Sequence, residues 1–465
     1  MKKNIIFFLI ASIILLVVGL FITSCGSCDN KFTNLLGSGS IGGGITLTNR
    51  AVHIDTNSAK DWYNSVLFDG NNYYISGWQE DSTKKYAIIK LNPDLTLNYA
   101  KYYTASGATD IGLTNLWFNP NNSNELFVGG WYTTGDGIIG KIDKNTGNLN
   151  ILKIFNSIGL VNLITDSTNL YGVSYNGYIL KTDLNLNVLS AKQISGYKFE
   201  NITQNSNYIA TYNFNSPYGV VIVKKDLSQA IQINTNGYQD QVPLMDNNNN
   251  LYLIDKNGSN NLVIAKIDIS NISSVSLDMS KEYTWSSLNG IYSGGFLSDG
   301  NIVIGITTAE TQNNIIFLKI NKNDLSIMNQ VKLSAKGGGN SQIVLATVFP
   351  TVDGGFFASR YIGLGKVGYA IKMPSDFNLG TNCVFNVSNP NITANNYTYT
   401  INTTAITMND VTITEGSIPT LTEENVSTFV GCMSPAPNVN GNVNGNIGGN
   451  RVGDSNIDPV TGRTR

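Results

Sequence analysis

The chain has 465 residues, of which 42% are hydrophobic and 13% are charged, and its formal net charge is −2. Its length and apolar content are sufficient for a large core in one domain or a few. The low charge shows no clustered cationic surface, which argues against nucleic acid as a partner. The abundance of Asn, Thr, Gly and Tyr is typical of turn-rich β structure.

Residues 1–24 are predicted to form a lipoprotein signal peptide. Lys2 and Lys3 precede an apolar run from Ile5 to Ile22, and small residues stand directly before Cys25. This order is typical of a bacterial signal in which Cys25 becomes the lipidated first residue. The alternative is an uncleaved membrane anchor, since about 18 apolar residues can span a bilayer. In both cases the rest of the chain is expected outside the cytoplasm.

Residues 25–43 are predicted to form a flexible Gly/Ser linker. Cys25 and Cys28 spell Cys-x-x-Cys, but a signal peptide precedes them and "GSGSIGGG" follows, instead of the strand and helix of a redox motif. The other two cysteines, Cys383 and Cys432, lie 49 residues apart. Because the chain is predicted to be exported, we expect a disulfide between them.

The central part of the chain repeats one phrase seven times, at a mean spacing of 47 residues. The phrase is two apolar residues, a lysine, any residue and Asp or Asn, or a close variant. Its lysines are Lys90, Lys141, Lys181, Lys224, Lys266, Lys319 and Lys372. Three further apolar segments accompany most copies, such as "NNYYISGW" before the lysine and "LNYAKYY" after it. Four antiparallel strands in each of seven units predict an all-β fold, a seven-bladed β-propeller over residues 44–373.

The last unit has no evident fourth strand after Lys372, whereas residues 44–54 supply a spare strand before the first unit. We predict that this N-terminal strand pairs as the outer strand of the last blade and closes the ring. The repeat lysines are expected to lie along apolar surface with their ammonium groups at a polar edge. Trp78 and Trp131, which occupy equivalent places in two blades, are expected to be packing residues.

The segments "DGNNYYISGW", "DGNIVIGIT" and "DGGFFASRY", followed by "AIIKLN" and "LNYAKYY", resemble secreted propeller-repeat proteins of thermophilic bacteria and archaea. The resemblance covers about residues 44–432 and implies the propeller fold and an extracytoplasmic location, but no activity. Some members also carry a Thr-, Asn- and Val-rich segment bounded by cysteines, as Cys383 and Cys432 bound one here. Tyr99 replaces the usual Trp, and blades three to five match the pattern poorly.

Residues 374–432 change to alternating Thr and apolar residues, as in "NYTYTINTTAITMNDVTIT", which predicts strands. We interpret this segment as a small C-terminal β extension or as an extended strap held at its base by the disulfide. An eighth blade is the alternative. Residues 433–465 lack apolar periodicity and are predicted to form a disordered Asn/Gly-rich tail.

The sequence offers no catalytic constellation. The single histidine, His53, lies in the predicted closing strand, and no Gly-x-Ser-x-Gly elbow or phosphate-binding loop is present. "DNNNN" at 246–250 offers oxygen ligands for calcium but lacks the Gly and Glu of a calcium loop, so a hairpin turn is favoured. The Asp-x-x-Thr-Gly phrase at 143–147 occurs once, whereas quinoprotein propellers repeat it in successive blades. We therefore predict no metal and no cofactor.

Recognition is the remaining class of function. Propellers commonly bind at loops that join one blade to the next, and aromatic residues with a polar tip are favoured at binding surfaces. The candidates are Tyr197, Tyr238, Tyr283 and Trp285. We predict a membrane-anchored extracytoplasmic lipoprotein, periplasmic or at the cell surface, that binds an envelope protein or glycan and is not an enzyme. The alternatives are a quinoprotein-type or glycan-cleaving enzyme and a structural component of the envelope or surface layer.

Overall fold

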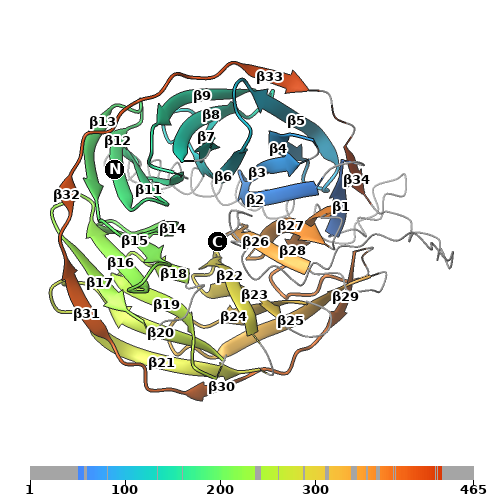
Figure 1. Ribbon diagram of the computed structural model, residues 1–465. Coiled ribbons are helices and arrows are strands. Elements are labelled where there is room, and N and C mark those ends of the chain that lie inside the picture. The colour runs from blue at the N-terminus through green and yellow to red at the C-terminus, as the bar shows by residue number, and fades with distance from the viewer. Residues whose placement is uncertain are drawn as a thin grey trace, which may run out of the picture. The chain divides into compact units, whose positions relative to one another are not determined.

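Seven small antiparallel sheets stand around a common centre in the computed structural model, as Figure 1 shows. The structure describes residues 51–431 except 57–59, 81, 134, 160, 236–241, 260, 286–287, 309–313, 337–342, 352–353, 363–366, 381, 383, 425 and 427. This part of the chain is all β, and it includes no helix of the length and apolar character needed to cross a membrane. The fold is the predicted seven-bladed β-propeller.

Six blades consist of four consecutive strands each, with the first strand nearest the centre (Figure 1). Blade 1 comprises β2 (Lys60–Phe68), β3 (Tyr73–Glu80), β4 (Lys84–Leu91) and β5 (Leu97–Ala105). Blade 2 comprises β6 (Ile111–Phe118), β7 (Glu125–Tyr132), β8 (Asp136–Asp143) and β9 (Leu149–Phe155). Blade 3 comprises β10 (Val161–Thr165), β11 (Asn169–Ser174), β12 (Tyr178–Asp183) and β13 (Val188–Gln193).

The next three blades repeat this order. Blade 4 comprises β14 (Phe199–Gln204), β15 (Tyr208–Asn213), β16 (Gly219–Lys224) and β17 (Ala230–Asn234). Blade 5 comprises β18 (Val242–Met245), β19 (Asn250–Lys256), β20 (Leu262–Asp268) and β21 (Ser276–Thr284). Blade 6 comprises β22 (Leu288–Phe296), β23 (Ile302–Thr308), β24 (Ile315–Ile320) and β25 (Ile327–Ala335).

Burial explains why the middle strands are continuous apolar runs. Both faces of each blade are covered by its neighbours, so in β3, "YYISGWQE", every residue but the last is buried. The outer strands are more exposed, and in β21, "SLDMSKEYT", only two residues are buried. The core therefore consists of apolar layers between adjacent blades, which is how each repeat obtains the cover it lacks alone.

Blade 7 is closed by the N-terminal strand, as predicted, and residues 44–50 of the predicted strand lie outside the described part of the chain. The blade comprises β26 (Ile343–Pro350), β27 (Phe356–Ile362), β28 (Val367–Met373) and β1 (Ala51–Asp55). β1 pairs antiparallel with β28 and places Ala51 opposite Ile371 and Ile54 opposite Gly368. The closing strand joins the two ends of the ring by backbone hydrogen bonds and so removes an open edge.

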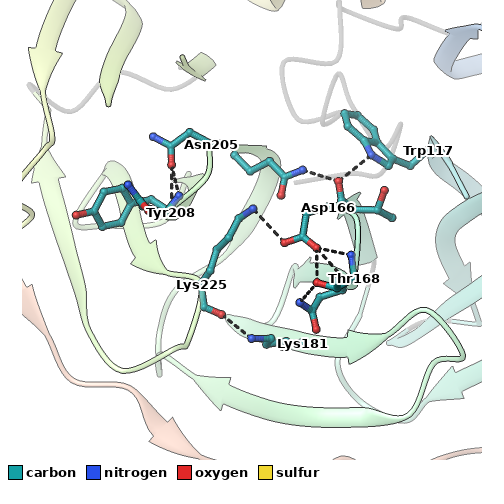
Figure 2. Close-up of polar contacts among 11 residues, drawn as sticks. Trp117, Asp166, Thr168, Lys181, Asn205, Tyr208 and Lys225 are labelled. Atoms are coloured by element: carbon teal, nitrogen blue, oxygen red, sulfur yellow. Dashed lines mark hydrogen bonds and ion pairs between the residues drawn. The ribbon is translucent and has the colours of Figure 1, made fainter. Parts of the chain in front are cut away.

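The repeat lysines lie on the third strand of each blade, and three of them bond to the next blade, whereas Lys141, Lys266 and Lys319 pair with a carboxylate of their own blade. Lys90 Nζ of blade 1 donates to the backbone carbonyl of Lys144 in blade 2 at 3.1 Å. Lys181 Nζ of blade 3 donates to the carbonyl of Lys225 in blade 4 at 3.2 Å (Figure 2). Blade 7 makes an equivalent bond to blade 1. The Lys181 ammonium also lies 5.7 Å from the ring centroid of Tyr171, so its stem follows apolar surface as predicted.

Lys225, whose carbonyl accepts the bond from Lys181, makes a second contact from blade 4 back to blade 3. Figure 2 shows Lys225 reaching back to Asp166 in the β10–β11 turn, with 3.2 Å between Nζ and Oδ2. Partial burial opposes ionisation of Asp166. The backbone N–H groups of Thr168 and the next residue, together with Lys225, nevertheless lower its pKa to about 2. The same pair recurs between blades 1 and 2, where Lys144 Nζ lies 2.7 Å from Asp69.

Trp78 and Trp131 are packing residues, as predicted. Both are fully buried, and together with Trp62 they form an aromatic cluster at the boundary of blades 1 and 2. The rings of Trp62 and Trp78 are stacked with centroids 5.3 Å apart, and Trp131 meets Trp78 edge-on at 4.9 Å. Offset and edge-on contacts of this kind add to the hydrophobic gain from burial.

After blade 7 the chain forms a belt, residues 385–431, that follows the outer rim of the ring (Figure 1). Its strands are β29 (Phe385–Ser388), β30 (Thr393–Asn396), β31 (Asn402–Ile406), β32 (Asn409–Asp410), β33 (Leu421–Glu424) and β34 (Phe429–Gly431). They add to β25, β21, β17, β13, β5 and β1, in that order. Blade 2 meets the belt through a single bridge between Phe155 and Glu415. Of the interpretations of residues 374–432, the strap is the one that the structure contains.

The charge of the belt complements the rim. The belt has no Lys, Arg or His, and its charged residues are Asp410, Glu415, Glu423 and Glu424. Three of these carboxylates pair with lysines of outer strands: Lys192 with Asp410 and Lys153 with Glu415, each at 2.6 Å, and Lys101 with Glu423. Exposed pairs contribute at most about 1 kcal/mol each, so the backbone pairing holds the belt and the charges favour its position.

Candidate functional site

The structure does not bring the predicted binding aromatics together at one exposed face. Tyr283 in β21 is 1% exposed, and its hydroxyl donates to the carbonyl of Leu325 in blade 6 at 2.6 Å. Trp285 packs half-buried against the same apolar cluster. Both side chains line a cavity of about 10 Å³, roughly the space that one water needs. Tyr283 is therefore a packing residue between blades 5 and 6, which removes it from an exposed binding face.

Tyr197 lies in the interblade turn between β13 and β14. Its ring is half-buried beside Phe199, with centroids 6.0 Å apart. Burial raises the pKa of its hydroxyl. The predicted residues that lie outside the described part of the chain are Tyr238, Cys25, Cys383 and Cys432. Lipidation, the disulfide and the role of Tyr238 therefore stay predictions.

The carboxylates singled out in the sequence shape turns. Asp246 of "DNNNN" accepts the backbone N–H groups of Asn248 and Asn250 at 2.9 Å each, which confirms the hairpin turn. Asp143 accepts backbone N–H groups of its own turn between β8 and β9 in the same way. Across the described residues, no three His, Cys, Asp or Glu side chains are grouped as metal ligands.

One carboxyl has a strongly raised pKa, at the seam between blades 7 and 1. Asp61 in β2 is completely buried and accepts the hydroxyl of Thr56 at 2.9 Å and its N–H at 3.3 Å. Burial raises the pKa of Asp61 to about 7; the Asp55 charge adds to this effect and the Thr56 bonds oppose it. Burial also lowers the pKa of His53 in the closing strand β1. Asp61 has no exposed surface, and its described hydrogen bonds come from Thr56, directly after the closing strand.

An open groove of about 510 Å³ lies on the outer rim between blades 2 and 3. Its walls are Lys153 of β9, residues 187–191 at the start of β13, and belt residues 410–413 and 415. The belt crosses here from its pairing with β13 to its single bridge with blade 2. This volume is within the range of sites that hold ligands.

Two aliphatic side chains in the lining of the groove are exposed. Val188 is 39% exposed and Leu189 is 56% exposed. In the pairing of β12 with β13, Thr182 stands opposite Val188 and Lys181 opposite Ser190, so Leu189 is the extra residue of a β-bulge. A bulge places an additional side chain on the strand without a partner residue across the sheet. Two adjacent aliphatic side chains are thereby available to a ligand.

The charged side chains at the groove are paired, each lysine with a carboxylate. Lys153 is paired with Glu415, and Asp410 with Lys192. The turn before β13 is held by Asp183, which accepts the backbone N–H of Asn187 at 2.8 Å and its side-chain amide at 2.7 Å. These bonds lower the pKa of Asp183 and keep the turn in one conformation. The groove is therefore preformed, which reduces the entropy that a ligand loses on binding.

The groove belongs to a wider apolar pattern on the rim. Every large hydrophobic side chain recorded as exposed in the described residues lies either on an outer strand or on the belt. These side chains are Leu97, Val188, Leu189, Met328, Val387, Ile418 and Phe429. Single exposed apolar residues are ordinary, but their restriction to one surface marks the rim as the region suited to interaction.

Sequence reasoning missed Val188 and Leu189, although a signal for them exists. They stand in "LNLNVLSAKQI", which reads as an ordinary fourth strand. The bulge residue in blade 1 is Asn98 and in blade 5 Asp278, because these residues are the unpaired ones in the same strand pairing. The signal is an aliphatic residue at a position that varies between blades, since it is Met328 in blade 6, and only an alignment of the blades reveals it.

No protein-family model matches this sequence, and no curated protein matches it. Among solved structures the chain is similar to the β-propeller domain of Cps50 (Swd1) from Myceliophteria thermophila. That match has 9% sequence identity and a TM-score of 0.44, and it covers 68% of this chain and 98% of the other. Such a likeness is confined to architecture and carries no argument about function.

Proposed function

We propose that this protein is a lipid-anchored, extracytoplasmic β-propeller that binds a protein or glycan of the cell envelope and catalyses no reaction. The anchor is supported by the order of Lys2, Lys3, the apolar run and Cys25. The binding role is supported by the architecture, because propellers present large rigid surfaces assembled from many loops and edges.

One observation carries the binding role. The exposed large apolar side chains of the described residues and a ligand-sized groove lie on the same outer rim. A mainly polar lining with two exposed aliphatic side chains is suited to a ligand that makes hydrogen bonds and some apolar contact. The lysines and carboxylates that sequence reasoning could have assigned to catalysis are engaged in turns and interblade contacts.

Lipidation is tested by expressing the full chain and its Cys25→Ser variant in bacteria supplied with a labelled fatty acid. We expect label in the wild-type protein and none in the variant, which stays with the membrane because its apolar run is not removed. Label in both proteins would refute the anchor, and membrane association of the wild-type protein without label would support the uncleaved anchor instead.

Binding is tested with the purified full-length protein in detergent, on an array of bacterial envelope glycans and against purified envelope proteins. Saturable binding without turnover is the expected result. Cleavage of the arrayed glycans, or quinone-dependent reduction of a dye by the protein, would refute the non-catalytic role and support the enzyme alternative.

A further inference from the structure

The belt shows which kind of ligand the outer strands accept. β31 pairs with all of β17, from Asn402 opposite Asn234 to Ile406 opposite Ala230. The other belt strands join their outer strands antiparallel in the same way. An extended segment is thus held against the rim by backbone hydrogen bonds, which is the binding mode called strand addition.

At blade 3 the belt leaves the first part of this edge uncovered, as it does on β5, β21 and β25, and at blade 3 the uncovered part lines the groove. The belt pairs with Lys192 and Gln193, and the N–H of Val411 donates to the carbonyl of Ala191 at 3.2 Å. Among the described strands, none pairs with the outer edge of residues 188–190. An uncovered strand edge is a template for another strand. The groove runs beside this edge, in continuity with the interface that the belt already uses.

We propose that the groove binds an extended segment of a partner protein, which adds as a strand to the free edge of β13 and packs aliphatic side chains on Val188 and Leu189. This inference rests on the proposed binding function and specifies the ligand. Because Lys153 is paired with Glu415 and Lys192 with Asp410, the contacting part of the segment is uncharged. β-branched residues suit it, as they suit the Thr-rich belt.

The lining of the groove favours a peptide over a glycan. None of its residues is aromatic, whereas sugar rings are commonly bound by packing on aromatic faces. A peptide strand can pair with the backbone groups of the uncovered edge and can pack on the two aliphatic side chains. The β-bulge at Leu189 limits regular pairing to a few residues, so side-chain contact supplies part of the affinity.

The test is to pan a phage-displayed library of random 12-residue peptides against the full-length protein in detergent. Two variants serve as counter-targets, Leu189→Asp and Met328→Asp. Met328 is the matched control because it is the bulge residue of blade 6 and is 51% exposed, close to the 56% of Leu189. Both side chains are on the surface, so neither change removes core packing.

We expect enriched peptides with aliphatic residues at alternate positions that bind the wild type and Met328→Asp equally and bind Leu189→Asp at least tenfold more weakly. Hydrogen exchange at residues 188–191 should slow when the best peptide is bound. Methylating alternate peptide nitrogens should weaken binding, because a strand donates its N–H groups to the edge. Failure to enrich any peptide, equal binding to Leu189→Asp, or indifference to methylation would overturn the inference.

This result is separable from that of the proposed function. Saturable binding of an envelope glycan or protein that Leu189→Asp leaves unchanged would overturn the strand-addition site while the binding module stands. Enzymatic turnover would overturn the proposed function, and the peptide experiment would then report on the groove alone.

Discussion

The buried carboxyl at the ring seam gives the sharpest quantitative prediction. Asp61 belongs to β2 beside the closing strand, and its bonds from Thr56 span the residues that link β1 to β2. Burial dominates its environment and raises its pKa to about 7 from an ordinary value of 3.8. Folding therefore holds a proton on this group over a pH range in which the unfolded chain releases it.

The sign and size of the effect follow from that difference. Between pH 4 and pH 7 the folded protein binds more protons at Asp61 than the unfolded chain does, so the free energy of unfolding falls as pH rises. Its contribution is complete below pH 3.8 and is lost once pH passes about 7. At about 1.4 kcal/mol per pKa unit, the difference between the two values corresponds to about 4 kcal/mol.

Asp61→Asn removes the ionisation and leaves a polar side chain of the same shape. We expect the free energy of unfolding of the variant, relative to wild type, to rise by about 4 kcal/mol between pH 4 and pH 8. Urea denaturation followed by tryptophan fluorescence at several pH values measures this. His53, whose pKa burial lowers, contributes with the opposite sign in both proteins and so cancels in the difference.

A matched control is Asp143→Asn. The pKa of Asp143 is lowered by backbone N–H bonds in its turn, so this carboxyl is ionised in both the folded and unfolded states above pH 5. Its variant should differ from wild type by a constant amount from pH 5 to pH 8. A pH-independent difference for Asp61→Asn would refute the assignment of Asp61 as a buried, protonated group.

Three further changes test packing and the belt. Gly77→Ala should lower the free energy of unfolding, measured by urea denaturation, by about 3 kcal/mol or more, because the added Cβ would lie 1.8 Å from the backbone oxygen of Trp62. A variant as stable as wild type would contradict this close contact between β2 and β3. Tyr283→Phe should cost about 1 kcal/mol, since the Leu325 carbonyl loses its donor; no loss by the same assay would argue against that bond. Deleting residues 385–431 uncovers outer edges on six blades, so light scattering should show concentration-dependent association, and a stable monomer would contradict this.

The ring was predictable because its signal is repeated. Each copy of the lysine phrase marks a third strand, and a missing strand at one end and a spare one at the other predicted the pairing of β1 with β28. The interblade bonds, such as that of Lys90 with the Lys144 carbonyl, were not visible. The phrase shows that a lysine is required, but its acceptor is a backbone atom 54 residues away that any sequence would supply.

The course of the belt was not predictable from its own sequence. Alternating Thr and apolar residues indicate strands, but they do not identify the strand on which each will pair. β31 pairs with β17 across about 170 residues, and the sequence between them contains many outer strands of similar composition. A weak signal was present in the charges, because an exclusively acidic segment follows outer strands that carry Lys101, Lys153 and Lys192.

The binding aromatics illustrate the limit of loop-based reasoning. Tyr283 stands near the end of an outer strand, in which successive side chains alternate between the two faces of the blade and only two residues are buried. A shift of one position decides between packing and exposure, and the sequence around "KEYTW" does not fix the register. In the structure the hydroxyl of Tyr283 meets a carbonyl of blade 6, so its polar tip is satisfied inside the protein.

Comparison of the blades with one another indicates where function lies. Features that recur, such as the lysine on the third strand and the Asp that caps a turn, are explained by construction of the ring and carry no information about a ligand. Two features at the groove differ between blades: blade 2 has a single bridge to the belt, and blade 3 carries Leu189 at the bulge position that is Asn98 in blade 1, Asp278 in blade 5 and Met328 in blade 6. Both differences border the same groove. Among the described blades the single bridge is specific to blade 2, and its coincidence with the exposed Leu189 at one place on the rim favours a binding site there.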